Sequence, residues 1–186
     1  GTTDTADKST TSSSNDTGRG YDATIKINPS LGTEILSGLN LFAGGHYTEI
    51  GPTPASGNNG DTYYEGVAGI TYDIGPVSIG GGRSGILTGN SQSSTAVDYY
   101  RNNMYGVAFN INDNLSVSYG LHESEQNFSN PAVGEAVTME VSSYQLAYTM
   151  GGASVRIAES KVDNKDYQTT ASADQSATTV SVSLAF

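Results

Sequence analysis

The sequence predicts an all-β protein whose strands run up and down in one antiparallel sheet, and three observations support this prediction. The last nine residues alternate, with Val180, Val182, Leu184 and Phe186 on one side of an extended strand and small or polar residues on the other. Similar alternation recurs along the chain, and no segment shows the period of an amphipathic helix. Short turns join pairs of these segments, and longer polar loops separate the pairs.

The composition narrows the classes of protein that this chain can represent. Its 186 residues include 23 glycines and 12 tyrosines but no cysteine, which excludes disulfides and thiol chemistry. The net charge of −11 argues against a nucleic-acid partner, because binding to nucleic acid needs a basic surface. Mean hydropathy is −0.34, and no apolar run approaches the roughly 18 residues of a membrane-spanning helix. This length criterion for helices does not apply to the strands of a membrane barrel, because every second side chain of such a strand faces a water-filled interior.

Taken in order, the chain divides into a polar start and nine predicted strands. We expect residues 1–18, mostly Thr, Ser, Asp and Gly, to be a mobile outer-loop segment, and residues 19–186 to form the strands. In the second strand the large apolar residues do not share a face, so we expect a bulge near Gly38. The nine segments are 21–28, 34–48, about 62–74, 77–83, about 98–111, 115–122, about 136–150, about 154–158 and a final strand after a loop at about 162–175.

An aromatic residue recurs at the end of every second strand, just before a tight turn or the terminus. These residues are Tyr72, Phe109, Tyr148 and Phe186, at steps of 37, 39 and 38 residues. Each repeat is a strand, a short turn, a second strand and a longer polar loop. Outer-membrane barrels have this asymmetry, with aromatic girdles at the membrane boundary, whereas a propeller repeat holds four strands. The sequence therefore predicts an up-and-down transmembrane β-barrel in which the four aromatics form a girdle.

Three stretches resemble the general diffusion porins of Gram-negative bacteria, in the style of the α-proteobacterial ones. They are the C-terminal residues 180–186, residues 70–75 and residues 105–115, and the resemblance covers about residues 20–186. The resemblance implies an outer-membrane homotrimer of 16-stranded barrels, in contact with membrane lipid and lipopolysaccharide. Each barrel would hold a water-filled pore for small hydrophilic solutes and ions. It also implies an inward-folded constriction loop after the fifth strand, which we expect to lie outside this chain.

Nine is an odd number of strands, whereas bacterial single-chain barrels have an even number. Either the count is wrong by one, or this chain is the C-terminal part of a larger barrel, which is the preferred interpretation. With about 20 residues per strand, seven further strands, as missing N-terminal strands or a companion chain, would give a 16-stranded barrel of roughly 330 residues. The alternative is a complete small barrel of eight or ten strands, acting as an adhesin or structural surface protein.

The same alternation identifies candidate pore-lining side chains. Lys26 lies between two isoleucines, and Arg156 lies between Val155 and Ile157. A basic side chain facing lipid at mid-depth would cost roughly 2–4 kcal/mol, so both should face water. Such side chains either set ion preference through their local field or merely solvate the wall. The alternation does not assign Arg83 to a face of the strand, because three glycines precede it. Its side chain would point either into the lumen or toward a neighbouring subunit. The predicted pore-lining residues are Lys26, Arg156, Glu65, Asp73, Asn110, Ser118, His122 and Gln145.

No motif indicates catalysis or a tight metal site. The segment 122–125 contains His, Glu and Ser, but adjacent strand residues point to opposite faces and form no triad by themselves. The glycine run 80–82 lacks the Gly-Lys-Ser/Thr of a phosphate loop. We therefore predict no enzyme activity and no cofactor. Acidic residues near the outer loops would bind Ca²⁺ or Mg²⁺ only loosely, through oxygen; they are Asp61, Asp98, Glu123, Glu125, Asp163 and Asp166.

Overall fold

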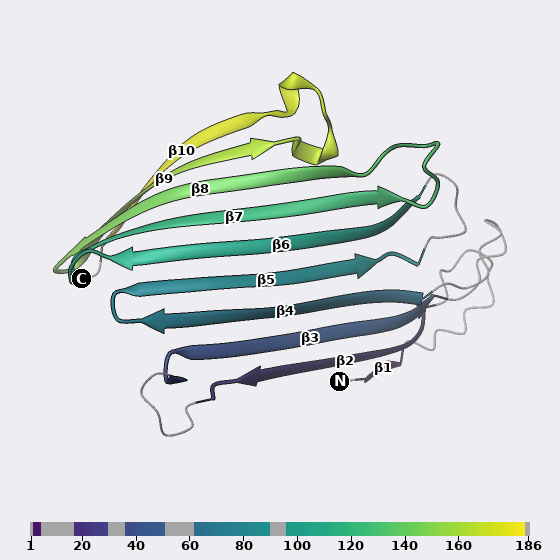
Figure 1. The fold of residues 1–186 in the computed structure, drawn as a ribbon, viewed down its shortest axis with the longest axis horizontal. Helices are drawn as coiled ribbons and strands as arrows, with labels where there is room; N and C mark the ends of the chain where they lie inside the picture. The colour runs from purple at the N-terminus through teal and green to yellow at the C-terminus, as the bar shows by residue number, and fades with distance from the viewer. Residues whose placement is uncertain (1, 5–16, 30–35, 51–61, 90–95, 185–186) are drawn as a thin grey trace.

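One antiparallel sheet contains every strand of the computed structural model, which describes residues 2–4, 17–29, 36–50, 62–89 and 96–184 (Figure 1). Each strand pairs only with its neighbours in sequence, so the sheet is an up-and-down meander. The all-β, antiparallel prediction is confirmed. A three-residue strand comes first, β1 (Thr2–Asp4), and nine long strands follow: β2 (Thr17–Ile27), β3 (Leu39–Ile50), β4 (Thr62–Ile74), β5 (Val77–Leu87), β6 (Val97–Asn110), β7 (Leu115–Phe128), β8 (Val137–Met150), β9 (Ala153–Asp163) and β10 (Gln175–Leu184).

The described strands form an open sheet. β10 pairs with β9 alone, and β1 covers only residues 19–21 of the outer edge of β2. Of the predicted outer-loop segment 1–18, the residues of β1 are strand, β2 begins at Thr17, and residues 5–16 lie outside the described part. Among the described residues, no helix is long and apolar enough to cross a membrane.

Tight turns lie at one end of the sheet and longer connections at the other (Figure 1). The tight turns are residues 75–76, 111–114 and 151–152, and Gly75 and Gly151 both adopt a left-handed φ of 57°. At the opposite end, residues 88–96, 129–136 and 164–174 connect the strands. This is the predicted alternation of short and long connections for three of the four hairpins.

The connection from β2 to β3 differs from its prediction. The second strand was expected from residue 34, with a bulge near Gly38, but β3 begins at Leu39 and its pairing with β4 is regular. Residues 36–38 form a turn instead, and the Asp73 amide donates to the Gly38 carbonyl at 3.1 Å, next to the Leu39–Tyr72 pair. The Asn28 side chain also donates to Asn40 Oδ1 at 3.2 Å. The shift in register lies in β2 instead, between residues 17 and 20.

Pairing between the strands divides their side chains into two faces, because residues directly opposite each other in a sheet share a face. We call the face that carries Ile25, Ile70 and Val180 the apolar face, and the face that carries Lys26 the polar face. Nearly all exposed large hydrophobic side chains of the described strands lie on the apolar face. Phe42 and Val67 are the exceptions.

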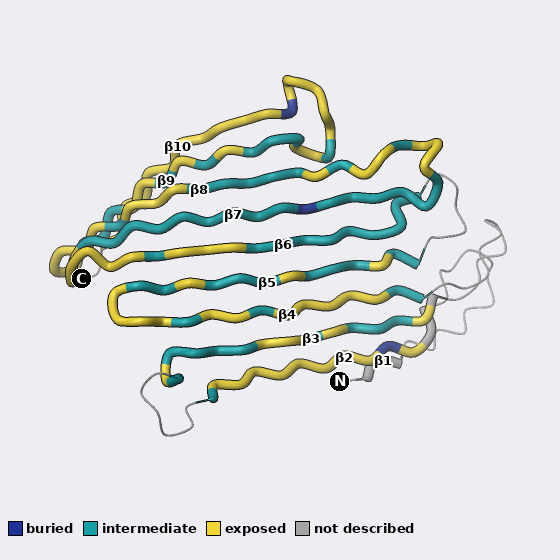
Figure 2. Tube along the Cα trace, in the orientation of Figure 1, coloured by how far each residue is buried: buried dark blue, intermediate teal, exposed yellow. Residues whose placement is uncertain are grey.

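The sheet is a single layer with almost no core. Apart from Gly20, which has no side chain, Ser124 and Ala173 are the only buried residues in the described part of the chain (Figure 2). A soluble sheet covers its apolar face with a second layer, and a large exposed apolar surface marks contact with a partner or a membrane. The fold therefore requires a cover for the apolar face that the described residues do not supply.

Phe42 explains why the sequence pattern of the second strand is irregular. Its side chain lies on the polar face, directly opposite Gly69 of β4. A Cβ atom at Gly69 would lie only 2.3 Å from Phe42 Cζ, so the ring occupies the space above the glycine. An aromatic ring that covers a glycine on the neighbouring strand is a known stabilising pair in sheets.

We predict that Gly69→Ala lowers the free energy of unfolding by about 1–3 kcal/mol, because the new methyl group displaces the Phe42 ring. Unfolding in urea, followed by tyrosine fluorescence in lipid vesicles, measures this change. Gly106→Ala is the matched control, since its Cβ would meet nothing closer than 3.9 Å. In a Phe42→Ala background the Gly69→Ala cost should largely disappear; an unchanged cost there would show that the ring is not the obstacle.

Candidate functional site: the polar face of the sheet

All eight predicted pore-lining side chains lie on the polar face. One row of paired residues runs from Lys26 across the sheet to His122 on β7, and a second runs from Asp73 to Ser118 and Gln145. The other three belong to the same face through their partners: Glu65 pairs with His46, Asn110 with Ser116, and Arg156 with Ala147. Their role in lining a pore stays a prediction.

Small and uncharged side chains dominate this face, and its few charges are widely spread. At the paired positions of β2–β10, the charged residues of the polar face are Asp22, Lys26, Glu65, Asp73 and Arg156. Lys26 lies on β2 and Arg156 on β9, and neither forms a hydrogen bond or ion pair with another described residue. Both side chains are exposed on the polar face.

The structure brings together one polar cluster that sequence reasoning only partly identified. His46 Nε2 lies 2.5 Å from Thr48 Oγ1, and the Tyr63 hydroxyl donates to Glu65 Oε2 at 2.8 Å. The rings of His46 and Tyr63 are 6.3 Å apart. A groove of about 280 Å³ runs beside this cluster, between β2 and β5. His46, Tyr63 and Asp22 were missed as lining residues, although Asp22 has the parity of Lys26.

Three other predicted lining residues have identified neighbours within the sheet. Asp73 accepts a hydrogen bond from the Ser78 hydroxyl at 2.5 Å, across the tight turn between β4 and β5. Ser118 and Gln145 stand directly opposite each other on β7 and β8. Asp73 therefore stabilises its hairpin, whereas Ser118 and Gln145 contribute polar surface in the middle of the sheet.

Aromatic side chains border the apolar face at two levels. Tyr72, Phe109 and Tyr148 lie on this face next to the tight turns, as predicted, and Phe186 lies outside the described residues. A second group lies closer to the long connections. Its rings stack across neighbouring strands, with centroids 6.0 Å apart for Tyr21–Tyr47 and 5.3 Å for Tyr47–Tyr64. Tyr119 and Tyr144, whose centroids lie 4.7 Å apart, belong instead to the row of paired residues that contains Tyr72. Sequence reasoning did not predict the group of Tyr21, Tyr47 and Tyr64 as an aromatic border, although Tyr47 lies between two polar residues.

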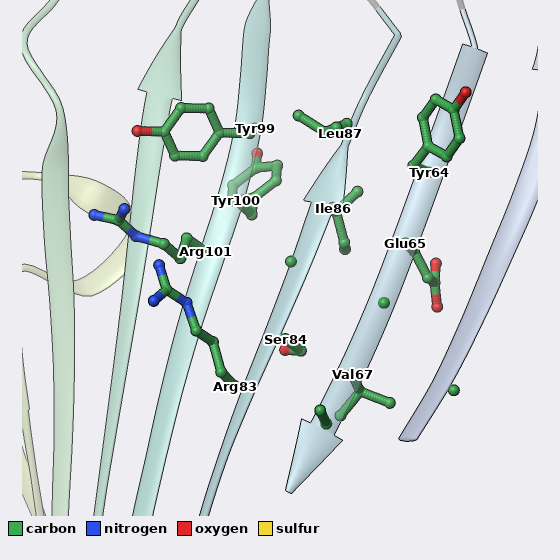
Figure 3. Close-up of a pocket in the computed structure, with 14 residues that line it drawn as sticks. Tyr64, Glu65, Val67, Arg83, Ser84, Ile86, Leu87, Tyr99, Tyr100 and Arg101 are labelled. Atoms are coloured by element: carbon green, nitrogen blue, oxygen red, sulfur yellow. The ribbon is translucent and has the colours of Figure 1, made fainter. Parts of the chain in front are cut away.

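The charged side chains of the apolar face gather toward the long connections. Arg101 Nη2 lies 2.6 Å from Glu125 Oε2, and the Tyr99 hydroxyl donates to the same carboxylate at 2.9 Å. Arg83, whose parity the sequence left open, is on this face opposite Ala68 and close to Arg101 (Figure 3). A hollow of about 620 Å³ adjoins these arginines.

The acidic residues predicted to bind cations loosely do not form one site. Glu125 is paired with Arg101, and Lys161 lies 2.8 Å from Asp163. Asp61 lies outside the described residues. In the part of the chain that the structure describes, no three His, Asp or Glu side chains come together as metal ligands.

Comparisons with protein-family models, with curated proteins and with solved structures give no match.

We predict that the two faces differ in access to water. Ser118 and Val117 are neighbours on β7 with opposite orientations, and the chain has no cysteine of its own. In lipid vesicles, Ser118→Cys should react with a hydrophilic, membrane-impermeant maleimide at least about tenfold faster than Val117→Cys, because lipid excludes the reagent from the apolar face. Stopped-flow labelling measures both rates. Equal rates for the two variants would contradict this assignment of the faces.

Proposed function

We propose that this chain forms part of an outer-membrane porin, a water-filled channel for the passive diffusion of small hydrophilic solutes and ions. The observation that carries the proposal is the one-layer sheet, which separates an exposed apolar face from a polar face with few charges. Lipid on one side and water on the other satisfy both faces at once. A sheet in water would leave its apolar side chains exposed.

The dimensions of the apolar face support a membrane location. On β4, Tyr64 and Tyr72 mark the two aromatic levels. Eight residues at about 3.3 Å each, tilted by about 40°, rise about 20 Å, close to the apolar band of about 25 Å in outer-membrane barrels. The charged side chains around Arg101 and Glu125 lie at the long-connection end, where headgroups and lipopolysaccharide would meet the protein.

The open edges of the sheet favour a larger barrel. An unpaired strand edge is unfavourable in lipid, because its backbone N–H and C=O groups have no hydrogen-bond partner there. The free edge of β10 and the uncovered length of β2 therefore need partner strands. We propose that further strands, N-terminal or from a companion chain, complete a barrel of 16 strands, and that three such barrels form a homotrimer. The small side chains of the polar face would leave a barrel of eight or ten strands poorly filled, which argues against the adhesin alternative.

We predict that the intact protein, inserted into a planar lipid bilayer, conducts ions in uniform steps with a linear current–voltage relation. A polar wall with few charges presents water to ions of both signs, which is why conduction is expected without a cofactor or an energy source. Single-channel recording of the purified complex measures the steps. Folded, inserted protein that leaves the bilayer insulating would refute the porin proposal.

We also predict that Lys26 and Arg156 bias the channel toward anions. One elementary charge about 8 Å from an ion in water contributes about 0.5 kcal/mol, so Lys26→Gln or Arg156→Gln should shift the permeability ratio about twofold toward cations. Reversal potentials in a salt gradient measure this ratio. The matched control is Lys161→Gln, the same charge change on the apolar face. An equal shift in the control would mean that the two residues act no differently from any surface charge.

A further inference from the structure

The connection between β9 and β10 folds onto the polar face of the sheet. It consists of residues 164–174 and includes two 3-10 turns, η2 (Lys165–Tyr167) and η3 (Ala171–Ala173). Figure 1 shows it at the long-connection end of β9 and β10. The Tyr167 hydroxyl oxygen lies 2.7 Å from Ser124 Oγ on β7, and its ring centroid lies 5.6 Å from that of Tyr100 on β6. The segment therefore extends past β8 across two further strands.

The burial of Ser124 shows that this contact is close. A single-layer sheet leaves both of its faces open to solvent, yet Ser124 is only 3% exposed. Ser124 and Tyr100 both belong to the polar face, since Ser124 pairs with Asn102 and Tyr100 pairs with Gln126. The cover over Ser124 is Tyr167. Ala173, the other buried side chain among the described residues, belongs to the same connection.

Hydrogen bonds at the two stems hold the connection in this position. Asn164 Nδ2 donates to the Thr138 carbonyl at 2.9 Å, and the Asn164 amide donates to Asp174 Oδ1 at 3.1 Å. Lys165 Nζ lies 3.3 Å from Gln175 Oε1. These contacts join the end of β9 to β8 and to the start of β10.

The backbone of the turn is unfavourable by itself. Asn164, Asp166 and Tyr167 have φ values of 55°, 57° and 59°. This is the left-handed backbone conformation, which residues other than glycine rarely adopt. Such conformations persist only where surrounding contacts determine them, and they gather at functional positions. Here the left-handed turn directs Tyr167 onto the polar face, where the contacts with Ser124 and Tyr100 hold it.

We propose that residues 164–174 form an inward-folded constriction at the long-connection mouth of the channel, with Tyr167 as its anchor. The segment narrows the opening, and it carries the charges of Lys165, Asp166 and Asp174 into the path of solutes. Tyr167 and Ser124 therefore determine the size limit for hydrophilic solutes at this mouth. This inference rests on the proposed channel function.

The test compares two tyrosines in the intact protein. Tyr167→Ala releases the segment and should raise single-channel conductance by at least about 1.5-fold, because the narrowest cross-section limits the current. It should also speed the entry of larger neutral sugars into vesicles. Tyr64→Ala is the matched control, since it removes the same side chain from the apolar face at the same end of the sheet. The control should change conductance much less.

A second measurement does not depend on conduction. We expect the docked segment to resist trypsin at Lys165, so Tyr167→Ala and the milder Ser124→Ala should be cleaved at that bond severalfold faster than the native protein in vesicles. Equal cleavage rates would overturn the docking of the segment. Conduction that responds equally to Tyr167→Ala and Tyr64→Ala would overturn the constriction while leaving the porin proposal intact. Absence of any conduction in the native protein would instead overturn the porin proposal.

Discussion

Strand register is the constraint on which the rest of this structure depends. The sheet has almost no buried side chains, so backbone hydrogen bonds between neighbouring strands hold the chain together. A slip of one residue would move Lys26 or Arg156 onto the apolar face and the adjacent isoleucines onto the polar face. Among the described strands, the pairing register shifts near Thr17 in β2 and near Val97 in β6, and both positions lie at the long-connection end of the sheet. Along the apolar length of the strands the two faces remain separate.

The separation of the faces determines which environment the sheet can occupy. Apolar side chains from β2, β4–β6 and β8–β10 remain exposed on one face, and small or polar side chains occupy most of the other. Transfer of that apolar area out of water is the largest stabilising contribution available to the chain. In the proposed membrane location, lipid would provide this transfer without a second protein layer, and the Tyr47–Tyr64 pair and the Arg101–Glu125 pair would lie near one boundary of the lipid.

The alternation of apolar and polar residues predicted the two faces of the sheet well, because successive side chains of a strand point to opposite faces. It placed eight lining residues on one face and three aromatics on the other. What it missed depends on contacts between distant residues. The bond between Asp73 and Gly38 joins the turn before β3 to the end of β4, and the Phe42 ring occupies the space above Gly69 on the next strand. The sequence did not assign Arg83 to a face of the sheet, because the glycines before it have no side chains that would show the alternation.

The inward-folded segment was also beyond sequence reasoning, since nothing near Tyr167 indicates that it meets Ser124, 43 residues away. In the proposed barrel, the small side chains on most of the polar face would project too little to narrow the channel. A connecting segment that folds inward, such as residues 164–174, would supply the narrowing. A connection fixed at both stems and anchored by a tyrosine can do this while the strands behind it keep their regular register.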